Sequence, residues 1–171
     1  MRHLKEKRKL SRTTAHRRAL GRAIVAALFR QFGEENREYI VTTDAKAKKF
    51  RSLAEKLITI AKRANVDGVK PERKLAARRQ VYQALGPAAF VRRTEESGVE
   101  RKLDLCRKLF DEIAPRYADR KGGYTRIVKT GAHRLGDGSQ KVLFAFVAGP
   151  KAAAAEGEAK KPEVKKSKKS E

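Results

Sequence analysis

Apolar residues recur at helical spacing in four stretches of the chain and at strand spacing in three shorter ones. The first stretch predicts a helix from Thr14 to about Phe32, because its apolar residues share one face while several arginines lie off that face. The apolar positions follow an i, i+4, i+7, i+8 pattern: Leu20, Ile24, Ala27 and Leu28. The residues before this helix show no apolar periodicity.

A β-branched run and a second helix follow. Residues Glu38 to Thr43 predict a short strand, and Asp44 is a plausible N-cap for a helix from Ala45 to about Ala64. The apolar residues of that helix form one stripe: Phe50, Leu53, Ala54, Leu57, Ile60, Ala61 and Ala64. The stripe predicts burial along the whole length of the helix.

Two further helices are predicted between Pro71 and Pro115. The first begins at Pro71, ends at Gly86-Pro87 and has Leu75, Val81, Tyr82 and Leu85 on one side. Residues 88–96 either extend this helix or form an insertion. The second helix is predicted to start near Ser97, because Ser97 and Glu100 have the spacing of a capping box. Its buried face is Val99, Leu103, Cys106, Phe110 and Ile113, and Pro115 ends it.

The C-terminal part changes to strand periodicity. Residues Tyr124 to Thr130 and Lys141 to Val147 predict two strands, joined by the glycine-rich connection from Gly131 to Gln140. The order α-β-α-α-α-β-β predicts an α+β fold with the helices packed on one face of a small mixed sheet. We expect a basic N-terminal arm at 1–12, one domain at 13–149 and a disordered Ala/Lys-rich tail at 150–171.

The net charge of the chain narrows the classes of function that fit it. The 171 residues include 43 Lys plus Arg against 20 Asp plus Glu, a formal net charge of +23, and the pI is about 10.6. Nine of these cations fall in the first 22 residues, against one acid, Glu6. A merely soluble basic surface explains a handful of extra charges, not 23. The excess indicates a polyanionic partner with a phosphate backbone.

Several other classes of function are disfavoured. The one cysteine, Cys106, excludes an intramolecular disulfide. No apolar run approaches the about 20 residues of a membrane span, and the apolar segment 23–29 lacks a signal-peptide cleavage pattern. An Arg-rich transit peptide fits the arm less well than a retained binding arm. The histidines His3, His16 and His133 lack metal-ligand spacing, so we expect no metal, no cofactor and no small-molecule substrate.

A catalytic reading is weak. Glu100, Asp104 and Asp111 could share a helix face, as in a two-metal nuclease. Their i, i+4 neighbours are basic, however, which is typical of ion pairs on a solvated helix face. Cys106 falls in the predicted core stripe and is interpreted as a small hydrophobic residue. We therefore predict that the chain is not an enzyme.

Two basic clusters remain as candidate RNA-binding sites. The first lies in the arm and first helix: Arg2, His3, Lys5, Arg8, Lys9, Arg12, His16, Arg17, Arg18 and Arg22. The second lies at the C-terminal strands: Lys121, Tyr124, Arg126, Lys129 and Arg134. The ring of Tyr124 could stack on a base or pack in the core, and packing is slightly favoured. Side-chain alternation, with Val128 assigned to the helix side, turns Lys129 outward and leaves Arg126 at the sheet edge.

The chain also resembles a known family. The matching segments are Met1-Arg2-His3, Arg8-x-Leu10-x-Arg12, His16-Arg17-x-Ala19, Thr42-Thr43, Ala45-Lys46-Ala47-Lys48, Leu57-Ile58-Thr59-Ile60-Ala61-Lys62, Leu109-Phe110, Pro115-Arg116-Tyr117 and Gly122-Gly123-Tyr124-Thr125-Arg126-Ile127. In this order they resemble the family of the seventeenth protein of the bacterial large ribosomal subunit. The segment 86–99 and the hairpin 129–137 are longer than the common pattern, and the tail lies outside the resemblance.

The resemblance implies a structural protein of the cytoplasmic ribosome. It implies binding to large-subunit ribosomal RNA near the rim of the exit tunnel, beside neighbouring large-subunit proteins. Contacts are expected through the basic arm, the first helix and the C-terminal hairpin face, by shape and phosphate recognition. Two alternatives stay open: a free DNA- or RNA-binding architectural protein, and an RNA-processing enzyme.

Overall fold

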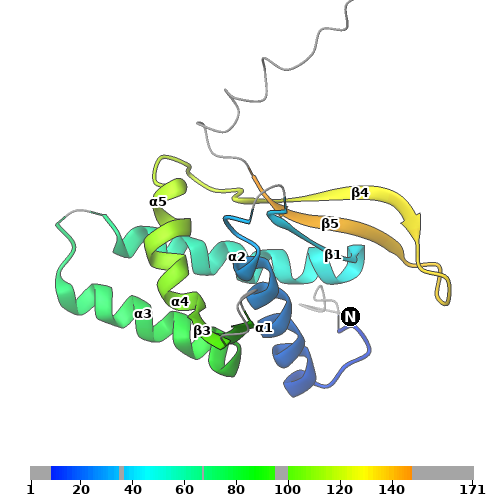
Figure 1. Ribbon diagram of the computed structural model, residues 1–171, viewed down its shortest axis with the longest axis horizontal. Coiled ribbons are helices and arrows are strands. Elements are labelled where there is room, and N and C mark those ends of the chain that lie inside the picture. The colour runs from blue at the N-terminus through cyan, green and yellow to red at the C-terminus, as the bar shows by residue number, and fades with distance from the viewer. Residues whose placement is uncertain (1–8, 35–36, 67, 95–99, 148–171) are drawn as a thin grey trace, which may run out of the picture.

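The computed structural model describes residues 9–34, 37–66, 68–94 and 100–147, with only the backbone described at 92–94 and 100–102. Figure 1 shows helices gathered against one side of a three-stranded sheet, and a two-stranded hairpin forms a separate sheet. The predicted α+β class is therefore confirmed. The residues assigned to the tail, 150–171, lie outside the described residues.

Helix α1 (Thr14–Arg30) begins where sequence periodicity predicts. Thr13 is its N-cap, and the Thr13 hydroxyl accepts a hydrogen bond from the His16 backbone N–H at 3.4 Å. The buried face differs from the predicted stripe, because Ala27 is exposed and Leu20 is only half-buried. The buried residues are Gly21, Ile24, Val25, Ala26, Leu28 and Phe29.

The buried face of α1 is rotated from the predicted one because α1 packs closely against α2 (Asp44–Ala64). A Cβ atom added at Gly21 would lie 2.7 Å from the Phe50 ring, closer than real Cβ atoms approach. Gly21 therefore lets the two helices approach closely, and this contact fixes which side of α1 is buried. Asp44 is the first residue of α2 and pairs with Lys48 at 2.9 Å, so the predicted N-cap role belongs to Thr43 instead.

Helix α3 (Pro71–Leu85) starts at proline, as predicted, and runs into a 3₁₀ turn, η1 (Gly86–Ala89). Gly86 has a φ of +54°, a conformation that glycine adopts without steric cost. Val81 and Leu85 are fully buried, but Leu75 is 50% exposed and does not belong to the core.

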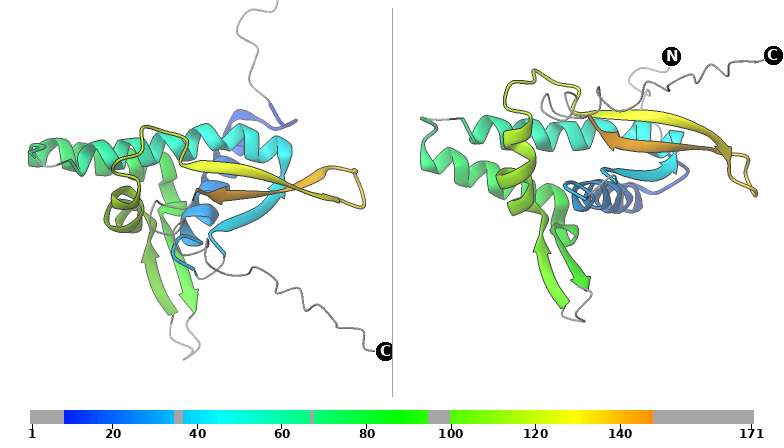
Figure 2. Two further views of the ribbon diagram at one scale, coloured as in Figure 1. Left: turned by 90° about the horizontal axis from the view of Figure 1, so that it is seen from above. Right: turned by 45° about the horizontal axis from the view of Figure 1, so that its top comes forward.

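The prediction of a helix from Ser97 was wrong. The chain forms an antiparallel hairpin of β2 (Phe90–Thr94) and β3 (Glu100–Asp104), which projects away from the helices (Figure 2). Of the predicted core residues for this segment, Val99 lies outside the described residues. Of the two alternatives for residues 88–96, the described part, 88–94, does not extend α3 and instead enters strand β2.

The helix that follows starts at α4 (Leu105–Lys108), and Asp104 is its N-cap. The Asp104 carboxylate accepts hydrogen bonds from the backbone N–H groups of Cys106 and Arg107, at 2.9 and 3.3 Å. Such a cap satisfies two N–H groups that the first turn leaves free. The N-cap of the helix thus lies seven residues after the predicted start at Ser97.

Pro115 does not end this helix. The chain continues through a wide π-type turn, η2 (Leu109–Ile113), into α5 (Ala114–Arg116). The Ala114 N–H bonds to the Leu109 carbonyl, five residues back. A proline ring collides with the carbonyl four residues before it in a regular helix, and the wider turn relieves that collision.

The main sheet has the order β1-β5-β4 and is antiparallel throughout, not mixed as predicted. Its strands are β1 (Tyr39–Thr43), β5 (Gln140–Phe146) and β4 (Thr125–His133). The register places Val41 opposite Leu143, and Leu143 opposite Val128. The side chains of Val142, Phe144 and Phe146 are buried towards the helices.

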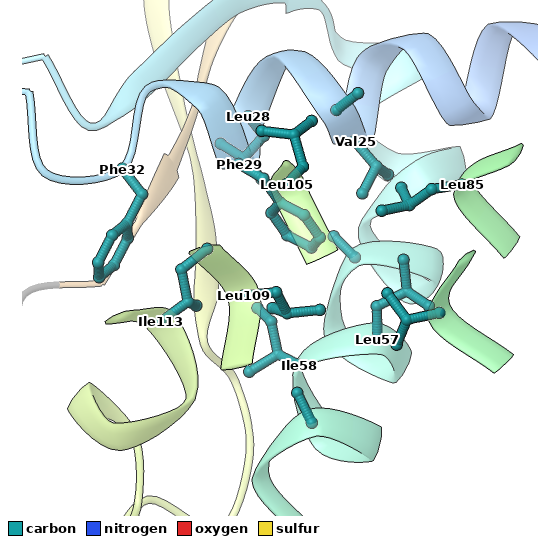
Figure 3. Close-up of a cluster of buried hydrophobic side chains, with 14 of the residues drawn as sticks. Val25, Leu28, Phe29, Phe32, Leu57, Ile58, Leu85, Leu105, Leu109 and Ile113 are labelled. Atoms are coloured by element: carbon teal, nitrogen blue, oxygen red, sulfur yellow. The ribbon is translucent and has the colours of Figure 1, made fainter. Parts of the chain in front are cut away.

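One continuous core joins the helices to this sheet. Figure 3 shows side chains of α1, α2, α3 and the α4–η2 segment converging, among them Phe29, Leu57 and Leu109. At the sheet end, the Tyr117 hydroxyl donates to the Val147 carbonyl at 2.7 Å. Burial of this ring raises the pKa of Tyr117 to about 12.

Candidate nucleic-acid interface

The N-terminal surface comprises the described candidates Lys9, Arg12, His16, Arg17, Arg18 and Arg22. The other candidates of the first cluster, Arg2, His3, Lys5 and Arg8, lie outside the described residues. Lys9, Arg12, His16 and Arg18 are exposed, and Figure 1 shows residues 9–13 at the end of the molecule where β4 and β5 project. The two arginines that remain are occupied by contacts within the chain.

Arg17 closes the segment before α1 onto the helix. Its guanidinium donates to the Arg12 carbonyl at 3.1 Å, to the Lys9 carbonyl at 3.5 Å and to the Thr14 hydroxyl at 3.4 Å. Leu10, inside the predicted arm of 1–12, packs partly against the core. The end of the arm is thus part of the folded surface.

Arg22 has a structural contact 62 residues away in sequence. Its Nε donates to the Ala84 carbonyl at 3.1 Å and its Nη2 donates to the Gln83 carbonyl at 3.3 Å. These are carbonyls of the last turn of α3, where a cation also interacts favourably with the helix dipole. Arg22 therefore caps the end of α3, and its contact with RNA stays a prediction.

The hairpin surface comprises Lys121, Arg126, Lys129 and Arg134, all exposed. Tyr124, the fifth candidate of this cluster, is 2% exposed and lies against Tyr117, with ring centroids 5.3 Å apart. A base cannot reach the face of this ring, so Tyr124 is corrected from a candidate contact to a core residue.

The two faces of β4 are the reverse of those predicted. Thr125 is 2% exposed and Ile127 packs partly against the core, whereas Val128 is 43% exposed. The Thr125 hydroxyl donates to the Glu55 carboxylate at 3.0 Å, and this buried hydrogen bond accounts for a polar side chain on the helix side. Arg126 consequently lies on the outer face with Val128, and Lys129 lies on the side of α2.

A basic hollow separates β4 from the first half of α2. Its lining residues are Asp44, Lys48, Arg51, Thr125, Arg126, Ile127 and Lys129. Lys48 pairs with Asp44 and Arg51 pairs with Glu55, each at 2.9 Å. Within the described residues, Arg126 and Lys129 have no carboxylate partner. Lys48 and Arg51 were not among the predicted site residues, although helical spacing places Asp44, Lys48 and Arg51 on one face.

The hairpin tip holds its arginine in an ion pair. Arg134 donates to the Asp137 carboxylate at 3.3 Å, and a ring nitrogen of His133 lies 2.9 Å from the Gly138 carbonyl. Hydrogen bonds from Ser139, followed by the charge of Arg134, lower the pKa of Asp137. The tip is therefore less positive than its sequence indicates.

Residues considered for catalysis have structural contacts. Both carboxylate oxygens of Asp104 accept hydrogen bonds, one from the cap N–H groups and the other from the Tyr82 hydroxyl. Asp111 pairs with Arg107 at 3.2 Å. Burial, then the charge of Asp104, raises the pKa of Cys106 to about 11, which keeps the thiol protonated at neutral pH. In the described ranges, no three His, Cys, Asp or Glu residues are grouped as metal ligands.

The structure also bears on membranes. Across the residues that it describes, none of the helices combines the length and apolar character needed to cross a bilayer.

Comparison with known proteins identifies the family. Residues 20–147 match the model of ribosomal protein L17. The chain belongs to the ribosomal protein L17 family. Large ribosomal subunit protein bL17 of Trichlorobacter lovleyi is 48% identical over 147 residues, covering 86% of this chain and 94% of its own length.

Two other relatives give the same result. The bL17 proteins of Desulforamulus reducens and Shouchella clausii are 43% and 45% identical, and the matches cover 82% and 81% of this chain and 97% of each relative. The family resemblance drawn from sequence motifs is thus confirmed. L17 is a family of structural ribosomal proteins, so the prediction that the chain is not an enzyme also holds.

Proposed function

We propose that this L17-family chain is a structural constituent of the large ribosomal subunit in the cytoplasm. The relatives that it matches over most of its length are named as large-subunit proteins. Its partners are then large-subunit ribosomal RNA and neighbouring proteins of the same particle. A net charge of +23 supports an RNA partner, since each bound phosphate releases counterions and gains affinity.

The N-terminal surface makes the first RNA contact. Lys9, Arg12 and Arg18 are exposed cations on or before the first turns of α1. Arg17 holds the backbone of residues 9–12 against the helix start, so these cations leave the domain at a defined position. Arg2, Lys5 and Arg8 extend the same contact along the RNA.

The hairpin surface makes the second contact, and one observation carries it. Arg126 and Lys129 line the basic hollow without a carboxylate partner in the described part of the chain. A cation that already has a carboxylate neighbour gains little from a phosphate, because it must first lose that neighbour. The two unpaired residues are therefore the best phosphate ligands of this surface, with Lys48 and Arg51 on the opposite wall.

The alternative is a free architectural protein that binds DNA or RNA outside a ribosome. Surface charge supports both functions equally, and the identity to large-subunit proteins favours the ribosomal one.

Sedimentation of tagged chain in sucrose gradients tests the choice. We expect the chain to migrate with the large subunit at both low and high salt, because many phosphate contacts and a folded protein surface hold it there. Release from the subunit at high salt, with binding to free DNA and RNA alike, would favour the architectural protein.

A further inference from the structure

The outer face of the main sheet carries an apolar patch. Side-chain alternation along the three strands turns five apolar residues away from the helices: Tyr39, Val41, Val128, Leu143 and Ala145. Val41 is 61% exposed, the largest value within this patch, and Leu143 and Ala145 are half-buried. Figures 1 and 2 show α1 and α2 on the other side of the sheet.

The patch is continuous across the sheet. The register aligns Val41, Leu143 and Val128 in one row, and Tyr39 and Ala145 in the next. Directly opposed residues have Cβ atoms about 5 Å apart, so the three aliphatic side chains of the first row touch or nearly touch. Contiguous apolar surface of this kind marks an interaction site more often than scattered exposed residues do.

The charges beside the patch are positive. Lys141 lies two residues before Leu143 on β5, and Arg126 lies two residues before Val128 on β4, both on the same face. Among the described strand residues on this face, none is acidic. A second copy of the chain would bring like charges together in a two-fold pairing, so self-association is disfavoured.

RNA and the tail of this chain fit the patch poorly. Riboses and phosphates are polar, and bases stack on flat rings or guanidinium planes, whereas the central row is aliphatic. The sequence after Pro150 has one large apolar residue, Val164, which cannot cover three exposed aliphatic side chains. Another protein fits the chemistry of the patch better than RNA or the tail does.

We propose that the outer sheet patch docks an extended segment of a neighbouring large-subunit protein. The segment has aliphatic side chains that cover the row of Val41, Leu143 and Val128, and a carboxylate that reaches Lys141. The inference rests on the proposed function, because the neighbour belongs to the same particle. It adds a protein-binding surface on the face of β4 opposite Lys129, and Arg126, on the edge strand, borders both this patch and the basic hollow.

Photo-crosslinking in assembled particles tests the inference. A diazirine-bearing amino acid replaces Val41 in the full chain, and large subunits are purified at high salt, irradiated and analysed by mass spectrometry. The matched control replaces Val66, which is 54% exposed in the loop after α2 and so similarly accessible. We expect position 41 to crosslink to one segment of one protein carrying aliphatic residues and Asp or Glu, and position 66 not to crosslink to it.

Two variants sharpen the result. Val128→Ser should lower the yield of the crosslink from position 41 several-fold, because it removes one end of the apolar row. Lys141→Glu should do the same by repelling the carboxylate. Both positions are exposed, so folding is expected to persist, and circular dichroism checks it.

Other outcomes overturn the inference. Crosslinks from position 41 to RNA, to residues 148–171 or to a second copy would assign the patch to a different occupant. Subunits that contain the chain but give no crosslink at position 41 would show that the patch faces solvent, with the proposed function intact. A chain absent from large subunits would remove the proposed function, and this inference with it.

Discussion

The two basic surfaces of the molecule use their arginines differently. On the N-terminal surface, Arg17 and Arg22 donate to backbone carbonyls of the chain itself. On the hairpin surface, Arg126 lacks such a contact within the described residues, and Arg134 pairs with a carboxylate. Arginines that carry the same charge in the sequence therefore differ in how much of that charge a binding partner can use.

The same difference distinguishes arginines that position parts of the fold from arginines whose charge can attract RNA. Arg17 and Arg22 fix where the arm leaves the domain and how α1 meets α3, and they keep their full charge because carbonyls are neutral. Arg134 is fixed by Asp137, which cancels much of its charge. A guanidinium bonded to carbonyls can therefore still attract RNA at a distance, whereas one bonded to a carboxylate attracts it weakly.

The largest expected effect is on the N-terminal surface. Deleting residues 1–8 removes Arg2, Lys5, Lys7 and Arg8. We expect the slope of log affinity for ribosomal RNA against log salt to fall in magnitude by about 3. Each of the four cations contributes roughly 0.7 to 0.9 to this slope if it contacts one phosphate. Circular dichroism should not change, because this deletion keeps Leu10 and the carbonyls that bind Arg17.

A truncation at Pro150 is the control for that deletion. It removes seven Lys and four Glu, and we expect only a small loss of non-specific binding and normal entry into large subunits. An N-terminal deletion that unfolds the domain, or a tail truncation that blocks entry, would contradict the division between arm, domain and tail.

The second prediction compares Arg22→Ala with Arg18→Ala. Loss of the two hydrogen bonds from Arg22 to the end of α3 should lower the free energy of unfolding by about 1 to 2 kcal/mol. This is at or below the roughly 1.5 to 3 kcal/mol of a hydrogen bond to a charged group, because the site is partly exposed to solvent. Arg18 is exposed on the same helix, so its removal should change stability by less than about 0.5 kcal/mol. Urea denaturation measures both.

For RNA binding, we expect Arg18→Ala to have the larger effect and Arg22→Ala the smaller one. Arg18→Ala should lower the salt slope by roughly 0.7 to 0.9, and Arg22→Ala by less. Equal stability of the two variants would mean that the Arg22 contact with α3 contributes nothing measurable.

The third prediction concerns β4. Arg126→Ala and Lys129→Ala should each lower the salt slope by roughly 0.7 to 0.9, and neither should change the melting temperature, since both side chains are exposed. The strand orientation predicted from the sequence, with Arg126 at the sheet edge, implies instead that Arg126→Ala lowers both quantities. A lower melting temperature for Arg126→Ala would restore the strand orientation that the burial of Thr125 contradicts.

The smallest effect is expected at the hairpin tip. Asp137→Asn should raise the salt slope by less than one phosphate contact, because it releases the charge of Arg134. The pKa of Asp137 is lowered in the folded chain, so the pair is present above the ordinary carboxyl pKa and is lost as pH falls through the folded value. Carboxyl NMR titration should show this low pKa, and Arg134→Ala should move it back towards its ordinary value.

Sequence periodicity was sufficient to locate helices and strands that bury only one face. It located α1, α2, α3, β1 and the β4–β5 hairpin, because one buried face repeats at a fixed spacing in each. It failed at residues 90–104, where apolar residues are few and the capping-box spacing of Ser97 and Glu100 was taken as a helix start. It also missed the π-type turn, because a single proline can end a helix or be accommodated by a wider turn.

The site was less predictable than the fold. The contact of Arg22 with Ala84 depends on tertiary packing across more than sixty residues, which no local pattern contains. The predicted faces of β4 depended on assigning Val128 to the helix side, because Tyr124 and Val128 offer more apolar contact than Ile127 with Thr125. The hydrogen bond from Thr125 to Glu55 reversed that balance. The RNA contacts of the N-terminal candidates and the role assigned to the tail stay predictions.

The pairing of β1 with β5 has a consequence for the order of folding during synthesis. Tyr39 pairs with Ala145, which is synthesised about a hundred residues later. At roughly 5 to 20 residues per second, synthesis of the intervening chain takes on the order of 5 to 20 s. Throughout that interval the arm and α1 have already been made, while the middle strand of the sheet does not yet exist. A nascent chain can therefore meet RNA through its first residues before its sheet closes, and the outer sheet patch can form only after the last strand is complete.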